Sequence, residues 1–159
     1  MTPSSQRSHS YAVNLRWTGN RGSGTSAYGD YGREHDVCAG DKGVIAGSAD
    51  RVFRGDPERW NPEEMLVAAL SQCHLLSYLA LCALDGVVVT AYEDDPRGRM
   101  VEGGDAPGRF AEVVLSPRVT VAQPEMVDAA THLHHQAHEE CYIANSVNFS
   151  VHVAPEVVC

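Results

Sequence analysis

A long apolar segment in the middle of the chain constrains the fold more than any other feature. From Met65 to Leu84 nearly every residue is apolar or small. Asn61 and Pro62, just before it, are typical of a helix N-cap and a first helical position, and Gly86, just after it, is a typical helix stop. A helix that is apolar on almost every side is usually a buried one. We therefore expect a central helix with other elements packed around it.

Alternation of apolar and polar residues predicts strands on both sides of this helix. A second helix is predicted from Pro124 to about Glu140, with apolar residues at helical spacing. Because strands and helices are segregated along the chain, the expected fold class is α+β, with the helices packed against an antiparallel or mixed sheet. Strands are expected within residues 11–17, 25–47, 86–92, 110–121 and 147–153.

Composition excludes several classes of partner. The formal charge of −9 and the pI of about 5.2 argue against nucleic acid or an acidic membrane surface, since both require clustered Lys and Arg. No apolar run approaches the roughly 20 residues that a membrane helix needs. Residues 1–10 are polar and lack the apolar core of a signal peptide. We expect a soluble, cytoplasmic protein with one domain over residues 1–159 and a polar tail at 1–10.

The five cysteines are odd in number, widely spaced and contain no C-x-x-C pair. This pattern argues against a secreted disulfide framework and against a cysteine-based zinc site. In a reducing compartment, each cysteine is then either a small core residue or a reactive thiol. The five are Cys38, Cys73, Cys82, Cys141 and Cys159.

Two of these cysteines lie where a reactive thiol could be placed. Cys73 is midway along the apolar helix, on a stripe with Leu70 and Leu76, where a packed and inert core thiol is the alternative, because an apolar setting raises a thiol's pKa. Cys141 lies where the second helix should end, and helix ends are accessible. Cys82 falls on the opposite face of the helix from Cys73, so we expect it in the core.

A histidine-rich stretch on the second helix is the other notable pattern. His134 and His138 have the i, i+4 spacing of a metal-binding pair, but a zinc site needs a third ligand. We therefore favour a solvated polar helix face and expect no metal and no cofactor. The stretch comprises His132, His134, His135 and His138.

The residues around both cysteines match a known pattern. Residues 61–74 read Asn-Pro-Glu-Glu-Met-Leu-Val-Ala-Ala-Leu-Ser-Gln-Cys-His. This segment resembles the helix signature of the osmotically inducible protein C / organic hydroperoxide resistance family, in which a cysteine follows the glutamate by ten positions. The segment from Ala137 through Cys141 to Asn145-Ser146 resembles the second-cysteine segment of that family. A strand with Trp17 and a glycine loop over 19–25 also fits, so the resemblance spans about residues 11–154.

The resemblance implies a fold, an activity and a set of site residues. It implies an intertwined homodimer with active sites at the subunit interface, and thiol-dependent reduction of hydroperoxides, often organic ones, without metal or haem. Cys73 would be the peroxidatic cysteine and Cys141 the resolving cysteine, which form a disulfide that a dithiol reductant reopens. This reductant would be a small molecule or a lipoylated or thioredoxin-type protein. Glu63 matches the glutamate of the family and Arg21 best matches its arginine, with Arg33 as a rival.

Helix geometry adds an expectation about how the site is assembled. Glu63 and Cys73 are ten residues apart, which is roughly 15 Å along one helix axis. One rigid helix cannot place both at the same reacting atom, so we expect the Arg–Glu pair to serve the cysteine of the other subunit.

Two departures from the family pattern concern the residues that follow the cysteines. His74 stands where Phe is frequent, and Tyr142 stands where Pro is frequent. Two alternatives to the enzyme stay open: a regulatory redox sensor that uses the same disulfide, and a non-catalytic binding module on the same fold.

Overall fold

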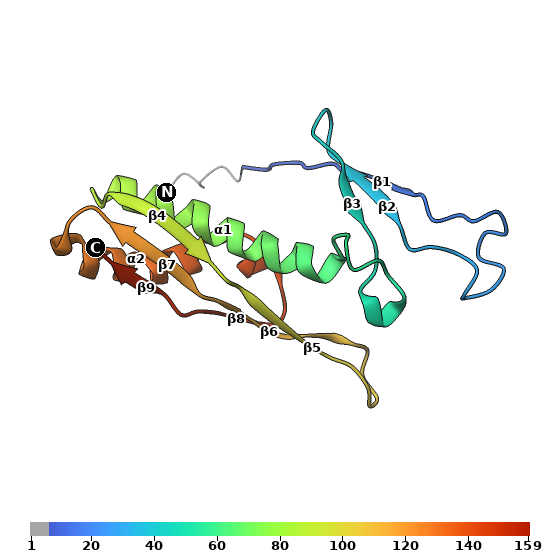
Figure 1. The fold of residues 1–159 in the computed structure, drawn as a ribbon. Helices are drawn as coiled ribbons and strands as arrows, with labels where there is room; N and C mark the ends of the chain where they lie inside the picture. The colour runs from blue at the N-terminus through green and yellow to red at the C-terminus, as the bar shows by residue number, and fades with distance from the viewer. Residues whose placement is uncertain (1–6) are drawn as a thin grey trace. The chain divides into compact units, whose positions relative to one another are not determined.

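The computed structural model describes residues 7–159 and follows the predicted order of strands and helices (Figure 1). Residues 1–6 of the predicted polar tail lie outside the described residues. By its internal contacts the chain divides into two compact units, Met1–Pro62 and Glu63–Cys159. The candidate cysteines and Glu63 belong to the second unit, and both candidate arginines belong to the first.

The first unit contains an antiparallel sheet in the order β1-β2-β3. Its strands are Asn14–Trp17, His35–Cys38 and Ile45–Gly47, so the strands expected within 11–17 and 25–47 are confirmed. The side chain of Trp17 donates a hydrogen bond from Nε1 to the Gly32 carbonyl at 2.8 Å. A short 3-10 helix, Arg51–Phe53, follows the sheet.

The central helix α1 spans Pro62–Leu84, as its sequence predicts. It ends where Gly86 adopts a φ of 76°. The Val87 N–H then bonds to the Cys82 carbonyl at 2.8 Å, which is the hydrogen bond of a Schellman motif. Glycine supplies this stop because its left-handed conformation is strained for residues that carry a Cβ atom.

Burial of α1 within the described chain is one-sided. Its buried residues recur every four positions, at Leu70, His74, Tyr78 and Cys82. The predicted stripe through Cys73 is therefore buried only in part: Leu70 is fully buried, whereas Leu76 is 67% exposed. Burial inside the described chain does not explain why the other side of α1 is apolar.

The strands of the second unit form two three-stranded sheets, in the orders β4-β7-β9 and β5-β6-β8. In both sheets one pairing is antiparallel and one is parallel, so the predicted mixed sheet is confirmed. The chain passes from one sheet to the other through short breaks at residues 95–96, 116 and 154–155. The strands are β4 Val89–Asp94, β5 Arg97–Val101, β6 Arg109–Leu115, β7 Pro117–Val121, β8 Ser150–Val153 and β9 Glu156–Val158.

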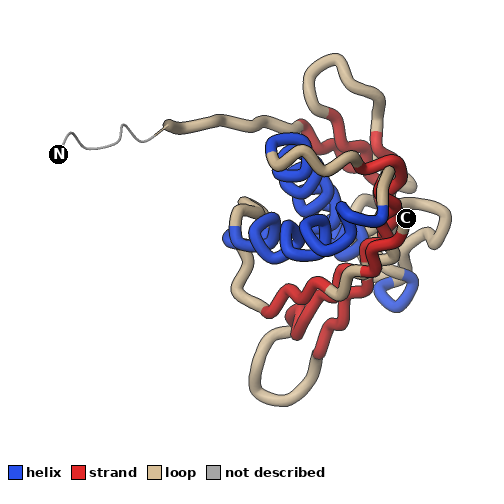
Figure 2. Tube along the Cα trace, turned by 90° about the vertical axis from the view of Figure 1, so that its left-hand side faces the viewer, coloured by secondary structure: helices blue, strands red, loops and turns tan. Residues whose placement is uncertain are grey.

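The second helix, α2 (Val127–Glu139), follows a 3-10 turn at Pro124–Met126, as predicted, and a further 3-10 turn lies at Ala144–Ser146. It lies beside α1 (Figure 2). The Tyr78 hydroxyl on α1 donates to the Ala130 carbonyl on α2 at 3.1 Å. One apolar cluster joins Tyr78 to α2 and β7, and another joins Leu70 to β6 and β8. Two cores thus follow one another along α1.

The length of the apolar segment in α1 differs from the expectation based on composition. Among the described residues, α1 is long and apolar enough to cross a membrane, judged by length and composition only. The statement that no apolar run approaches this length was therefore wrong, because small residues such as alanine and serine extend the apolar run.

Candidate functional site

The structure brings Cys73 and Cys141 together. Cys73 lies midway along α1 and is half-buried, whereas Cys141 follows the end of α2 and is 1% exposed. The two thiols are close enough for Cys73 to act on the proton of Cys141, and both are free, as are the three other cysteines. The two residues are far apart in sequence, and the packing of α2 against α1 places them at one point.

The backbone around Cys141 fixes the position of its sulfur atom. The Cys141 N–H bonds to the His138 carbonyl at 3.3 Å, and the Asn145 N–H bonds to the Cys141 carbonyl at 3.0 Å. The Ala144 N–H points at Cys141 Sγ at 3.4 Å. A short turn after α2 therefore holds this thiol toward α1.

Burial raises the pKa of the Cys141 thiol, and the contact with Cys73 raises it further. Cys141 therefore keeps its proton at neutral pH, and its S–H group is available as a donor to Cys73. A thiolate is the reactive form of cysteine. The site therefore combines an accessible thiol, Cys73, with a buried and protonated one, Cys141.

Glu63 lies in the first turn of α1, where a carboxylate suits the positive end of the helix dipole. Its Oε2 atom is buried and has no hydrogen-bond partner among the described residues. Since Glu63 and Cys73 stand ten residues apart on one continuous helix, roughly 15 Å of helix axis separates them. The structure does not bring Glu63 to the cysteine of its own chain.

The two candidate arginines of the first unit differ in how firmly they are held. Arg33 lies over two aromatic rings, 4.5 Å from the Tyr28 centroid and 4.1 Å from the Tyr31 centroid, and bonds to the carbonyls of both residues. Arg21 is 63% exposed and forms one loose ion pair with Glu34 at 3.7 Å. Arg21 is therefore the arginine whose guanidinium is less committed to contacts within its unit.

Sequence reasoning missed a buried histidine pair next to the cysteines. His74 is fully buried, and its Nε2 lies 3.0 Å from Nδ1 of His134, which is 3% exposed. The expectation that the histidines of α2 form a solvated face was therefore wrong for His134. The helical spacing contained the necessary signal, because His134 follows the buried Ala130 by four residues.

Burial keeps both histidines neutral. It is the main cause that lowers the pKa of His74 to about 4 and that of His134 to about 3, and nearby imidazoles add to the effect. The His134 ring also stacks on Tyr78, with centroids 3.8 Å apart. The pair therefore acts as part of the core near neutral pH and not as a source of charge.

The three remaining cysteines lie outside the candidate site. Cys82 is buried in the core, as expected, where burial raises its thiol pKa. Cys38 is half-buried in β2, and Cys159 is exposed. Within residues 7–159, no group of three or more His, Cys, Asp or Glu side chains is arranged to hold a metal ion.

The model of the family described as OsmC-like protein matches residues 55–156, which is more than half of the chain and includes both cysteines. The chain belongs to the OsmC-like family. No curated protein matches it.

Solved structures of OsmC-like proteins share its fold. An OsmC-like protein of unknown function from Vibrio cholerae is 29% identical, with a TM-score of 0.80 over 94% of this chain and 99% of that one. An organic hydroperoxide resistance protein from Elizabethkingia anophelis is 13% identical, with a TM-score of 0.69 over 96% and 97%. An organic hydroperoxide resistance protein from Legionella pneumophila is 12% identical, with a TM-score of 0.65 over 97% and 100%. At the two lower identities the likeness shows the fold alone.

Family membership fixes the broad class of the protein. The OsmC-like family includes hydroperoxide-resistance proteins, which supports a redox protein of the stress response. Proteins of this family are soluble, and the core helix of a soluble protein meets the same length and composition test as a membrane span. We therefore interpret α1 as a helix of a soluble protein that packs into the core along one side.

Proposed function

We propose that this OsmC-like protein is a thiol-dependent peroxidase that reduces organic hydroperoxides through Cys73 and Cys141. The contact between the two thiols carries the proposal. An accessible thiol beside a buried one is the arrangement that a peroxidatic and a resolving cysteine require, since a sulfenic acid condenses with a neighbouring thiol.

The proposed reaction has two steps on the protein. The Cys73 thiolate attacks the terminal oxygen of the hydroperoxide, so that an S–O bond forms, the O–O bond breaks and the alkoxide leaves as an alcohol after it takes up a proton. Cys73 is then a sulfenic acid, and the Cys141 sulfur displaces its hydroxyl as water to form a disulfide. A dithiol reductant restores both thiols by exchange and is itself oxidised to a disulfide.

The buried position of Cys141 suits the second step. While Cys141 keeps its proton, it does not compete for the hydroperoxide, and its S–H group stabilises negative charge on Cys73. When Cys73 becomes a sulfenic acid, the resolving sulfur is already in contact with it, which gives ring closure the advantage of proximity.

An arginine and Glu63 complete the proposed site. A guanidinium holds a thiolate and a peroxide oxygen together and stabilises the alkoxide as it leaves. We assign this role to Arg21, because Arg33 is held between two tyrosines, and we assign Glu63 to orient the guanidinium. The unpartnered Oε2 of Glu63 supports this assignment.

We also propose that the protein works as a homodimer in the cytoplasm. Leu76 and Leu84, on the apolar side of α1, are 67% and 86% exposed. A second subunit that covered this side would remove their apolar surface from water. Five free thiols suit a reducing compartment. The reductant is then a small dithiol or a lipoylated or thioredoxin-type protein.

A steady-state assay with cumene hydroperoxide and dithiothreitol tests the activity. We expect turnover in the wild-type protein, none with Cys73→Ser and strong impairment with Cys141→Ser. Cys159→Ser is the matched control and should keep full activity, because that thiol is exposed and distant in sequence from the pair. Full activity with Cys73→Ser would overturn the proposal, and one slow oxidation without turnover would point to a redox sensor.

A further inference from the structure

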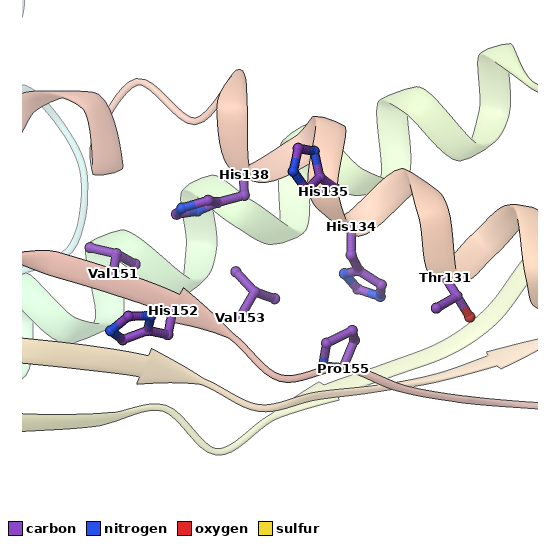
Figure 3. A pocket seen from close by; sticks show the side chains of 8 residues that line it. All are labelled: Thr131, His134, His135, His138, Val151, His152, Val153 and Pro155. Carbon is purple, nitrogen blue, oxygen red and sulfur yellow. The ribbon is translucent and has the colours of Figure 1, made fainter.

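A histidine-lined pocket lies between α2 and the strand β8 (Figure 3). Its volume is about 300 Å³, which is the lower end of the range for small-molecule sites. Both walls contribute to it: α2 supplies three imidazoles, and the β8 side supplies aliphatic groups and the imidazole of His152. The lining residues are Thr131, His134, His135, His138, Val151, His152, Val153 and Pro155.

Two polar atoms of the lining are buried and have no hydrogen-bond partner among the described residues. His134 is 3% exposed, its Nδ1 is occupied by His74, and its Nε2 has no partner among the described residues. Nδ1 of His138, one turn further along α2, is in the same condition. Figure 3 shows both rings extending from α2 toward the β8 side of the pocket. Buried polar atoms are normally paired, so these nitrogens indicate a site for a polar group.

The bond to His74 leaves His134 Nε2 free to act as either a hydrogen-bond donor or an acceptor, depending on the tautomer. If His74 Nε2 carries the hydrogen and donates, then His134 Nδ1 accepts and His134 Nε2 is a donor. If His134 Nδ1 donates instead, its Nε2 is an acceptor. A hydroxyl group is both donor and acceptor, so it satisfies His134 in each of these two arrangements.

The lining also selects for a ligand without charge. None of the eight lining residues is a carboxylate, lysine or arginine. Burial keeps His134 neutral, since its pKa is lowered to about 3. A charged group placed against His134 would lose its hydration, and this neutral imidazole would offer no opposite charge in return. Val151, Val153 and Pro155 offer apolar surface for a short hydrocarbon chain.

We propose that this pocket binds a small, neutral aliphatic alcohol, with the hydroxyl group on His134 Nε2 and the hydrocarbon chain on the β8 side. An alcohol is also what the proposed peroxidase reaction releases, but the site stands without that reaction. Because His74 directly follows Cys73 on α1, an occupied pocket is one hydrogen bond away from the residue next to the reactive thiol.

Ring-nitrogen NMR of the histidines tests the site, with 1-hexanol as the probe and the Cys73→Ser variant as the protein, so that thiol chemistry plays no part. We expect a saturable shift of the His134 nitrogens, transmitted to those of His74. Exposed His132, at the other end of the stretch, should not respond. Hexanoate, the anion of matched length, should leave His134 unchanged.

Two variants separate a bound hydroxyl from a general apolar effect. His134→Phe keeps a ring on Tyr78 but removes Nε2, and should weaken hexanol binding by about threefold or more, the value of one net hydrogen bond. His135→Gln changes an exposed lining residue and should bind as before. The proposal is overturned if hexanol does not shift His134 up to its solubility limit, or if hexanoate shifts it equally. Neither result would bear on turnover of hydroperoxides.

Discussion

At the scale of single residues, the buried His74–His134 pair should make the protein sensitive to acid. A histidine whose pKa is lowered by folding is protonated more readily in the unfolded chain, so stability falls as the pH drops below the unfolded value of 6.5. From pH 7.5 to pH 5.0 we expect a loss of about 2 kcal/mol in the free energy of unfolding for each of the two histidines. Urea denaturation followed by circular dichroism at the two pH values measures it.

The matched variants are His74→Gln and His132→Gln. The first removes one buried imidazole and should reduce the loss between the two pH values, even though it lowers stability at both. The second replaces an exposed imidazole on α2 and should leave the loss unchanged. An equal pH dependence in all three proteins would show that the buried pair is not the cause.

The cysteines should differ in reactivity before any peroxide is added. Cys141 is 1% exposed and burial raises its pKa, so few of its thiols are thiolates at pH 7.5. We expect iodoacetamide to modify Cys73 more than tenfold faster than Cys141, with exposed Cys159 as the internal reference. Mass spectrometry of tryptic peptides over time gives the three rates. Modification of Cys141 ahead of Cys73 would reverse the roles assigned to them.

At the scale of elements, the end of α1 depends on one backbone conformation. Gly86 has a φ of 76°, and nothing lies within 4 Å of the position that a Cβ atom would occupy. Gly86→Ala should therefore lower the free energy of unfolding by about 1 kcal/mol through backbone strain alone. Gly43→Ala is the control, since Gly43 also has open space around it but no positive φ. Urea denaturation of both variants should show a loss only for the first.

The elements with strong local signals could be predicted from sequence. Both helices begin and end close to the predicted residues, because caps, proline and glycine act locally. Strands β5 and β9 could not be predicted. Every residue of β5 is exposed and two of its five are arginines, so it lacks an apolar face, and β9 is only three residues long. Pairing with β6 and β7 creates these strands, and a sequence pattern does not show pairing.

The cysteines of the candidate site could be predicted from sequence, but the buried histidine beside them was missed. The resemblance to a known family pointed to Cys73 and Cys141, whereas composition alone left Cys73 as a plausible core thiol. His134 was misjudged because it stands in a stretch with three other histidines, although the packing of α2 on α1 turns its ring inward. The environment of such a residue is set by its tertiary contacts and not by its residue type.

At the scale of the whole molecule, the arrangement of Glu63 and Cys73 on one helix determines how a complete site is assembled. The helix separates them by roughly 15 Å, so we expect Glu63 to serve the reacting cysteine of another subunit. The exposed apolar side of α1 is consistent with such a partner. The proposed homodimer would then be required for catalysis as well as for burial of apolar surface.

Mixed dimers test this prediction directly. Cys73→Ser and Glu63→Gln should each be inactive or strongly impaired as homodimers. If Glu63 serves the cysteine of its partner, a heterodimer of the two variants contains one complete site, made of Cys73 from one subunit and Glu63 from the other. Such a heterodimer should show about half of the wild-type turnover, because one of two symmetry-related sites is restored. The assay is the cumene hydroperoxide assay, with differently tagged subunits co-purified.

The alternative arrangement predicts a different result from the same proteins. If Glu63 acts on the cysteine of its own chain, each subunit of the heterodimer carries one defect in its own site, and turnover stays at the level of the impaired homodimers. A heterodimer of wild-type and doubly substituted Cys73→Ser/Glu63→Gln subunits is the control. It should be inactive if the sites are shared and half-active if each is built from one chain, so the two heterodimers must give opposite results.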